Sequence, residues 1–143
     1  MKVENLLSSK PANLITIGPE ASVFDALEIM AEKNIGALLV TEGKKMIGIL
    51  SERDYARKVI LKGKASKDTR VKEIMTSEVI SVSTDHIVEE CMHIMSSKHI
   101  RHLPVLNDGE LKGIISIGDV VKAIISEKEF TIKQLENYIS GTG

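Results

Sequence analysis

Two short stretches of the sequence have the residue types and the spacing to bind a ligand. GILSERDY (residues 48–55) and GIISIGDV (residues 113–120) both contain a glycine, two apolar residues, a serine and, three residues later, an aspartate. Ser-x-x-Asp is the spacing of a helix capping box, in which the serine caps the helix and the acid reaches back to it. A helix N-terminus also attracts anions, and a carboxylate beside it suits neutral donors such as the two hydroxyl groups of a ribose. From the residues alone, a plain cap and a ligand site are equal alternatives.

Both stretches belong to an internal repeat that occupies most of the chain. The segment that begins at Ile15 aligns without a gap with the segment that begins at Ile80, at a constant offset of 65 residues. Each copy predicts a short strand, an amphipathic helix, two strands joined by a hairpin turn (EGKK or NDGE), and a closing helix. We expect Ser22 with Asp25, and Asp85 in the second copy, to cap the amphipathic helices. The predicted fold class is α/β, with a β-α-β-β-α unit used twice.

The repeat also predicts the domain organisation. A unit of about 50 residues buries too little surface to be stable alone, so we expect the two repeats to pack as one pseudo-twofold domain. The assignment is repeat 1 at residues 8–62, a polar linker at residues 63–76, repeat 2 at residues 77–128 and a C-terminal helical tail at residues 129–143. The far end of the linker is expected to dock through Val71, Ile74 and Met75. The tail has an apolar stripe that covers either this domain or a second subunit, formed by Phe130, Ile132, Leu135 and Ile139.

The overall composition argues against several classes of function. The formal net charge is −1 and aromatic residues are 3% of the chain, so nucleic-acid binding through a basic surface or stacked rings is not expected. No apolar stretch approaches the roughly 20 residues of a membrane span, and the N-terminus lacks the pattern of a signal peptide. The single cysteine, Cys91, rules out an internal disulfide and fits a reducing compartment. We therefore expect a cytoplasmic protein with no membrane partner.

Residues that could support catalysis or hold a metal are few. His99 and His102 are close in sequence, but Pro104 argues against one helix carrying both, and no CxxC, HExxH or acidic cluster supplies further ligands. Cys91 falls on the apolar stripe of a predicted helix, where a buried and inert thiol is expected. We therefore expect no catalytic residue, no metal site and no prosthetic group.

The motifs together carry a family likeness. With NIGALLV (residues 34–40) and KHIRHLPV (residues 98–105) at the start of the second strand, the doubled unit resembles a pair of CBS domains, also called a Bateman module. The resemblance covers about residues 8–128, and both copies of the Ser-x-x-Asp motif are complete. It implies two clefts related by a pseudo-twofold axis, which bind an adenosine compound: AMP, ADP, ATP, S-adenosylmethionine or NAD.

The resemblance also implies which residues bind. Each cleft would take its Ser-x-x-Asp from one repeat and its second-strand loop from the other, with the aspartate holding ribose and isoleucines packing on adenine. One cleft would combine Ser51, Arg53, Asp54, Ile80, Ile100, Arg101 and His102. The other would combine Ser116, Asp119, Ile15, Ile35, Gly36 and Ala37, with Lys10 as its nearest cation. Because Arg101 and His102 carry donors that their counterparts in repeat 1 lack, the Asp54 cleft is expected to be the phosphate-selective one.

The expected function is a regulatory module that senses adenine nucleotides or NAD. It would signal to an unidentified regulated protein through a change of conformation or of oligomeric state, and a homodimer is expected. The alternative is a constitutive interaction or scaffold subunit whose clefts are vestigial. Intact serine and aspartate in both copies of the motif argue against that alternative.

Overall fold

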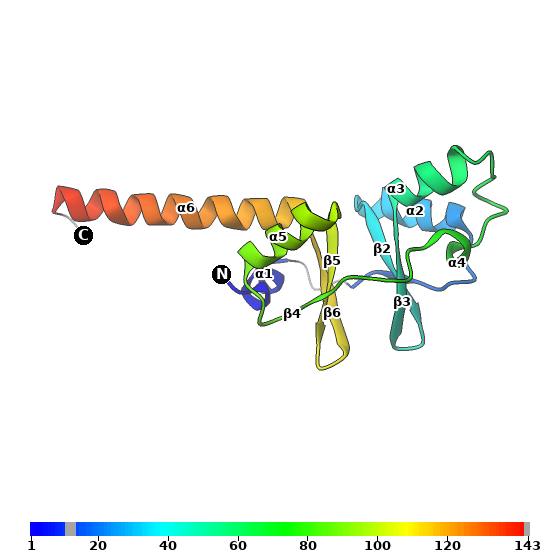
Figure 1. The fold of residues 1–143 in the computed structure, drawn as a ribbon, viewed down its shortest axis with the longest axis horizontal. Helices are drawn as coiled ribbons and strands as arrows, with labels where there is room; N and C mark the ends of the chain where they lie inside the picture. The colour runs from blue at the N-terminus through cyan, green and yellow to red at the C-terminus, as the bar shows by residue number, and fades with distance from the viewer. Residues whose placement is uncertain (11–13, 142–143) are drawn as a thin grey trace. The chain divides into compact units, whose positions relative to one another are not determined.

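A computed structural model describes residues 1–10 and 14–141, and Figure 1 shows its helices and strands. In chain order these are α1 (Val3–Ser8), β1 (Thr16–Ile17), α2 (Val23–Lys33), β2 (Ala37–Glu42), β3 (Lys45–Ser51), α3 (Glu52–Tyr55), the π-helical segment η1 (Ala56–Ile60), α4 (Val71–Ile74), β4 (Val82–Ser83), α5 (Val88–Lys98), β5 (His102–Asn107), β6 (Glu110–Ser116) and α6 (Ile117–Ser140). The order β-α-β-β-α therefore occurs twice, and the predicted α/β class is confirmed.

Each repeat builds a three-stranded sheet with the same strand order. In the first repeat this order is β1-β2-β3, with β1 parallel to β2 and β2 antiparallel to β3. The parallel pair follows from α2, because a crossover helix returns the chain to the sheet in its original direction. The second repeat has the order β4-β5-β6, again with its first two strands parallel.

The hairpin turns lie where the sequence predicts them. Gly43 has a φ of 63° in the β2–β3 turn, and Asp108 and Gly109 have φ values of 51° and 80° in the β5–β6 turn. Positive φ at two successive turn residues matches the twist of a two-stranded hairpin, and Asp-Gly is a favoured pair for it. In the β2–β3 hairpin the register places Ala37 opposite Ser51, so the start of β2 lies beside the end of β3.

The starts of the two amphipathic helices differ. Ser22 Oγ accepts a hydrogen bond of 3.0 Å from the N–H of Asp25 at the start of α2, as predicted. The prediction that Asp85 caps α5 is wrong, because that helix begins only at Val88. Asp85 lies in the preceding turn, and the helix start is instead stabilised by the Glu90 carboxylate, which accepts the N–H of Ile87 at 3.0 Å.

Two hydrophobic cores lie in two compact units. One unit contains residues 1–10, 82–106 and 113–141, and the other contains residues 14–81 and 107–112. The buried core of the first consists of Val3, Leu6, Val82, Val88, Cys91, Met95, Leu103, Val105, Ile115, Val120 and Ala123. The buried core of the second consists of Ile17, Val23, Ala26, Met30, Leu38, Val40, Leu50, Val59, Val71 and Ile74.

Each unit contains a short helix that precedes the other repeat in the chain. α1 precedes repeat 1, but its Val3 and Leu6 are buried in the core of the unit that holds repeat 2. α4 precedes repeat 2, but its Val71 and Ile74 are buried in the core of the unit that holds repeat 1. Residues 8–10, which the sequence assigns to repeat 1, accordingly lie with repeat 2.

The two short helices dock through the same backbone contacts. The N–H of Val3 donates to the carbonyl of His86 and the N–H of Val71 donates to the carbonyl of Ala21, both at 2.8 Å. Ala21 and His86 are equivalent positions of the repeat, so α1 and α4 are equivalent segments. Their offset is 68 residues, three more than the offset between the repeats themselves.

The last helix, α6, runs without a break from repeat 2 into the predicted tail. Its residues Val120 and Ala123 are buried, whereas its side chains from Lys128 onward are exposed apart from a half-buried Asn137. Residues 142–143 of the predicted tail and residues 11–13 of predicted repeat 1 lie outside the described residues. Across residues 1–10 and 14–141, no helix has both the length and the apolar character needed to cross a membrane.

Candidate functional site

Both Ser-x-x-Asp motifs form complete capping boxes. In the first, the N–H of Asp54 donates to Ser51 Oγ at 3.2 Å, and the N–H of Ser51 donates back to Asp54 Oδ2 at 3.0 Å. In the second, the corresponding distances between Asp119 and Ser116 are 3.1 Å and 2.8 Å. The cap interpretation is therefore confirmed for both motifs, and each cap fixes a carboxylate at the start of a helix.

The start of the second strand in each repeat lies against the same helix N-terminus. The carbonyl of Gly36 accepts the N–H of Glu52 at 3.1 Å, and the carbonyl of Arg101 accepts the N–H of Ile117 at 2.8 Å. These backbone hydrogen bonds place Gly36 beside the Ser-x-x-Asp motif of repeat 1 and Arg101 beside the Ser-x-x-Asp motif of repeat 2. The combination of each motif with the second-strand residues of the other repeat stays a prediction.

The glycine that opens each motif permits close approach of a residue in or just after a short helix, α4 in the first motif and α1 in the second. A Cβ atom on Gly48 would lie 2.6 Å from Met75 Sδ and 3.0 Å from the carbonyl oxygen of Thr76. A Cβ atom on Gly113 would lie 3.0 Å from Leu7 Cδ2. The motif therefore needs glycine because a neighbouring segment packs directly on the strand.

Asp54 is surrounded by donors that the sequence did not single out. Lys58 Nζ lies 3.2 Å from Asp54 Oδ1 and also donates to the carbonyl of Ile74 at 2.9 Å. Thr76 Oγ1 donates to Asp54 Oδ1 at a longer 3.4 Å. The side chain of Asp54 is only 14% exposed. The spacing of four residues between Asp54 and Lys58 on a helix is a signal that could have identified this pair.

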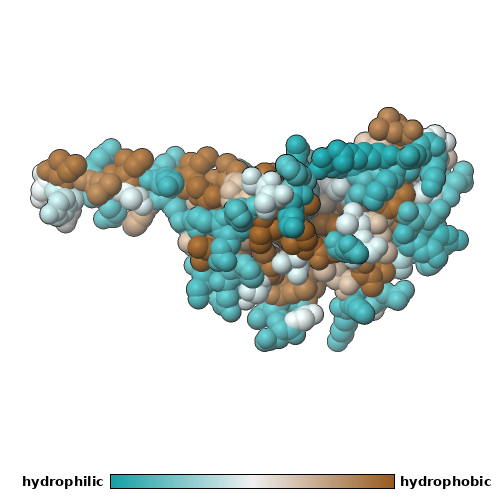
Figure 2. All heavy atoms as spheres, in the orientation of Figure 1, coloured by the Kyte–Doolittle hydropathy of each residue, from teal (hydrophilic) through white to brown (hydrophobic). Residues whose placement is uncertain are grey.

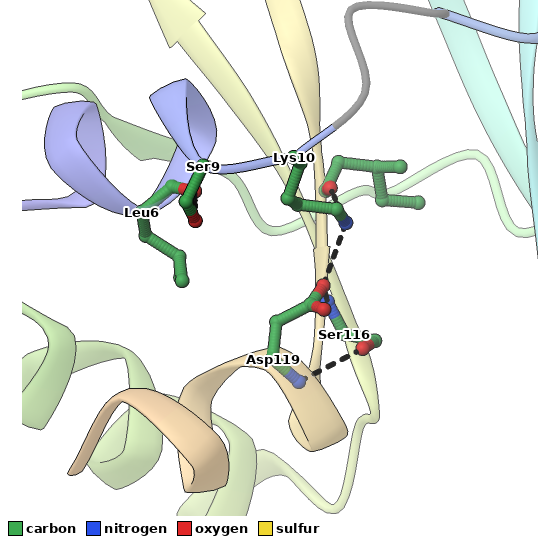
Figure 3. A network of polar contacts seen from close by, with 6 residues as sticks. Leu6, Ser9, Lys10, Ser116 and Asp119 are labelled. Atoms are coloured by element: carbon green, nitrogen blue, oxygen red, sulfur yellow. Dashed lines mark hydrogen bonds and ion pairs between the residues drawn. The ribbon is translucent and has the colours of Figure 1, made fainter. Parts of the chain in front are cut away.

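Asp119 is paired with Lys10, which the sequence indicates as the cation nearest to the Asp119 set. Lys10 Nζ lies 2.6 Å from Asp119 Oδ2 and donates to the carbonyl of Ile114 at 2.9 Å. Figure 3 shows Lys10 reaching from the end of the N-terminal segment to the start of α6, beside Ser116. Partial burial raises the pKa of the Asp119 carboxyl, but hydrogen bonds from Lys10 and Ser116 and the charge of Lys10 outweigh it, so the pKa lies below its ordinary value.

The remaining predicted residues occupy varied positions. Ile15 and Ile35 pack on the core of the unit with repeat 1, and Ile100 packs on the other core. Ile80 is exposed. The remaining side chains are the exposed Arg53 and Arg101, the half-buried His102 and the buried Ala37. Ala37 could therefore offer a ligand mainly its backbone.

Replacing Lys10 by methionine is expected to raise the pKa of Asp119, because the burial remains while the partner charge is lost. A carboxyl whose pKa is lowered by folding stabilises the fold above its unfolded pKa of about 3.9 and loses this effect as pH falls through the folded value. At pH 7 the variant should therefore unfold more easily, by about 1 kcal/mol. Carboxyl titration by NMR and urea unfolding measure both effects. Lys10→Arg is the control that keeps the charge, and an unchanged Asp119 pKa in Lys10→Met would contradict the pairing.

The cysteine sits in an environment unsuited to a nucleophile. Cys91 is fully buried in the core under α5, and burial raises the pKa of its thiol to about 11. The thiolate population near neutral pH should then be about 100-fold lower than for an ordinary cysteine. We expect an alkylating reagent at pH 8 to modify Cys91 at least that much more slowly in the native protein than in urea. Equal rates in both states would contradict this.

No cluster of three or more histidine, cysteine, aspartate or glutamate side chains within residues 1–10 and 14–141 could hold a metal ion. The chemistry of the sites is thus that of two capped carboxylates with adjacent ammonium groups. Such groups bind hydroxyl donors and anions.

The family-level comparison agrees with this repeated architecture. A protein-family model described as the CBS domain matches residues 3–61 and 71–126. The chain belongs to the CBS-domain family. The two CBS matches begin at Val3 and Val71, the first residues of α1 and α4. Each CBS sequence unit therefore starts with the short helix that the structure packs on the other repeat.

Individual relatives support the same assignment. "CBS domain-containing protein CBSX3, mitochondrial" of Arabidopsis thaliana is 42% identical over 125 residues, which cover 84% of this chain and 61% of the plant protein. The chain thus spans about three fifths of that relative's length. A putative signal-transduction protein with CBS domains from Burkholderia ambifaria MC40-6 has a TM-score of 0.86 at 48% identity, with 88% of this chain and 95% of that chain covered.

A third relative was solved with ligands. The CBS domain pair of protein MJ0100, in complex with 5′-methylthioadenosine and S-adenosyl-L-methionine, has a TM-score of 0.77 at 29% identity. The similarity covers 89% of this chain and 98% of that chain. Both of those ligands contain adenosine.

Proposed function

We propose that this CBS-domain protein is a regulatory module that binds an adenosine-containing ligand at its Ser-x-x-Asp motifs and signals the bound state to a partner protein. The observation that carries the proposal is the doubled site: each repeat holds a partly buried aspartate at a helix N-terminus with an ammonium group next to it. The adenosine ligands of the MJ0100 domain pair support the ligand class.

The chemistry of the carboxylates suits a ribose. An ionised carboxylate accepts hydrogen bonds only, and two vicinal hydroxyl groups can donate to it together. Lys10 and Lys58 already neutralise Asp119 and Asp54. Hydroxyl donors on the same oxygens would release these ammonium groups toward the phosphates of a nucleotide. The proposal therefore gives Lys10 and Lys58 a role in reading the phosphates of AMP, ADP, ATP or NAD.

The two sites are proposed to differ in selectivity. Arg101 and His102 can donate to phosphate oxygens, whereas Gly36 and Ala37, at the equivalent positions of repeat 1, have no side-chain donors. The residues grouped with Asp54 and with Asp119 from the sequence are retained as the proposed binding sets. Under this proposal the Asp54 set prefers the ligand with more phosphate charge.

Regulation would operate by population shift. A ligand changes the conformation or the oligomeric state of a protein only by the difference in its affinity for the two states. We propose that the output is such a change, made by a homodimer and sensed by a regulated protein. Neither a catalytic residue nor a prosthetic group is part of the proposal, and the cytoplasmic compartment stays a prediction from the sequence.

Calorimetry with a panel of ligands tests the proposal. AMP, ADP, ATP, NAD and S-adenosylmethionine would each be titrated into the purified protein, with GTP as the control for the base. We expect at least one adenosine ligand to bind, and GTP to bind more weakly because the proposed adenine contacts are specific. If no adenosine ligand binds at millimolar concentration, the sensor proposal is wrong. The result would then favour the alternative, a scaffold subunit with vestigial clefts.

A further inference from the structure

The C-terminal helix α6 presents an apolar stripe that its own unit does not bury. Val121, Ile125, Ile132, Leu135 and Ile139 are exposed, from 38% at Val121 to 83% at Ile139. Their spacing is that of a heptad repeat, with successive steps of four and three residues once Lys128 is counted at the position between Ile125 and Ile132. Isoleucines occupy all three a positions, and Val121, Lys128 and Leu135 occupy the d positions. Figure 2 shows hydrophobic residues along α6, between hydrophilic ones.

The outer half of α6 has little to stabilise it within its own unit. The helix packs against α5 through its first half, and residues 128–136 are all exposed. A helix of about 13 residues is marginal in water unless an apolar face packs on something. The apolar stripe continues along this outer half to Ile139. A partner with a matching heptad stripe would bury this apolar face and stabilise the outer half.

We propose that the partner is a second copy of this chain, and that two α6 helices pair antiparallel along their stripes. In an antiparallel pair centred on residue 130, Ile125 packs against Leu135 of the second copy and Val121 against Ile139. Each exposed outer half then lies along the anchored inner half of the other helix. The stripe from Val121 to Ile139 is about 27 Å long, and this arrangement covers all of it in both copies.

Charge selects the antiparallel orientation. A parallel pair in register would place Lys128 opposite Lys128 in the apolar seam, where two like charges are unfavourable. The antiparallel pair places Lys128 opposite Ile132 and brings Lys122 beside Glu136 of the second copy at both ends. At the centre the same pairing sets Glu129 beside Glu129 of the second copy, and Lys128 of each copy, one residue away, offsets these two negative charges. The stripe is thus complementary to its own reversed copy.

Sedimentation equilibrium of four proteins tests the pairing: wild type, Leu135→Glu, Lys128→Leu and Phe130→Glu. We expect a wild-type dimer, at least tenfold weaker association for Leu135→Glu, and tighter association for Lys128→Leu, which completes the seam. Phe130 is the matched control, because it is 66% exposed on the same helix. The prediction from the sequence that groups it with Ile132, Leu135 and Ile139 is wrong, because Phe130 lies on another face of α6 than the heptad stripe. Phe130→Glu should dimerise as wild type does.

Two outcomes would overturn the proposal. One is a wild-type protein that stays monomeric at hundreds of micromolar, and the other is a dimer that Leu135→Glu does not weaken. A chain truncated after Glu127 lacks the outer half of α6 but keeps every core residue. If the proposal is right, this truncated chain should be monomeric. Because nucleotide titration of these variants is a separate measurement, failure of the pairing and failure of the ligand proposal are distinguishable.

Spin labels report the orientation. Phe130→Cys and Asn137→Cys place labels seven residues apart on one face of α6, while the buried Cys91 stays unlabelled. In the antiparallel dimer the two labels at position 137 are separated by about 21 Å along the helix axis, whereas the two labels at position 130 have no separation along that axis. The measured distance at 137 should therefore exceed that at 130 by roughly 10 Å. Equal distances would indicate a parallel pair and contradict the proposed orientation.

Discussion

Replacing Gly48 by alanine is expected to lower the free energy of unfolding by about 2–3 kcal/mol, because the added methyl group has no room. It would meet Met75 Sδ at 2.6 Å and the carbonyl oxygen of Thr76 at 3.0 Å. The thioether can move aside, but the carbonyl belongs to the backbone that bridges to Ile49. Thr76 and Ile49 exchange two hydrogen bonds of 2.9 Å, so this backbone cannot shift without straining them. Urea unfolding of the two proteins measures the difference.

Alanine substitutions at two further glycines should have smaller effects on the free energy of unfolding, in proportion to the space around each Cβ position. Gly113→Ala should cost about 1 kcal/mol, because its Cβ would meet only the flexible end of Leu7 at 3.0 Å. Gly18→Ala is the matched control, because nothing lies within 4 Å of its Cβ position, and it should be neutral or slightly stabilising. Adding Met75→Ala to Gly48→Ala should recover part of the loss. Equal effects at all three glycines would show that close packing is not the reason for glycine in the motif.

Converting Asp54 or Asp119 to asparagine is expected to weaken one of two nucleotide binding events by about tenfold to a hundredfold. Hydrogen bonds to a charged acceptor contribute about 1.5–3 kcal/mol, and asparagine removes the charge and one acceptor. The amide oxygen can still accept the serine N–H, so the helix cap should survive. Calorimetry resolves the two binding events if their affinities differ. We expect such a difference because different residues are grouped with Asp54 and with Asp119.

A third aspartate provides the control for helix capping alone. Asp25 occupies the same position after Ser22 at the start of α2 but lies outside the proposed sites. Asp25→Asn should leave both binding events unchanged. If Asp54→Asn and Asp119→Asn behaved as Asp25→Asn does, the two motifs would be caps and nothing more.

Much of the fold was predictable because its determinants are local. The offset of 65 residues, the Asp-Gly turn and the apolar spacing of α2 each act within one repeat, where sequence patterns report them directly. The two capping boxes were predictable for the same reason. Lys10 was singled out as the cation nearest to the Asp119 set, and it does pair with Asp119 across 109 positions of the chain, while its role in ligand binding stays a prediction.

The features missed from the sequence depend on contacts distant in the chain. Thr76 reaches Asp54 only because the segment after α4 packs on β3. The equivalence of α1 and α4 is hidden because their offset differs by three residues from that of the repeats, and because Val3 and Val71 open short, weakly patterned segments. A search at an offset of 68 would have aligned VENLLS with VKEIMT. The error at Asp85 has a different cause. The start of α5 is stabilised by Glu90, the third residue of the helix, and not by a side chain that precedes the helix.

The exchanged short helices have a consequence for how the chain is made. α1 is synthesised before repeat 1, yet its Val3 and Leu6 join a core whose other members extend to Ala123. Repeat 1, in turn, lacks Val71 and Ile74 until the chain after it has been synthesised. Neither core is therefore complete when its own repeat is, and contacts of such wide sequence separation form late. A gene cut between the repeats would yield two chains that each carry a piece of the other's interior, and each would finish folding only after the two had met.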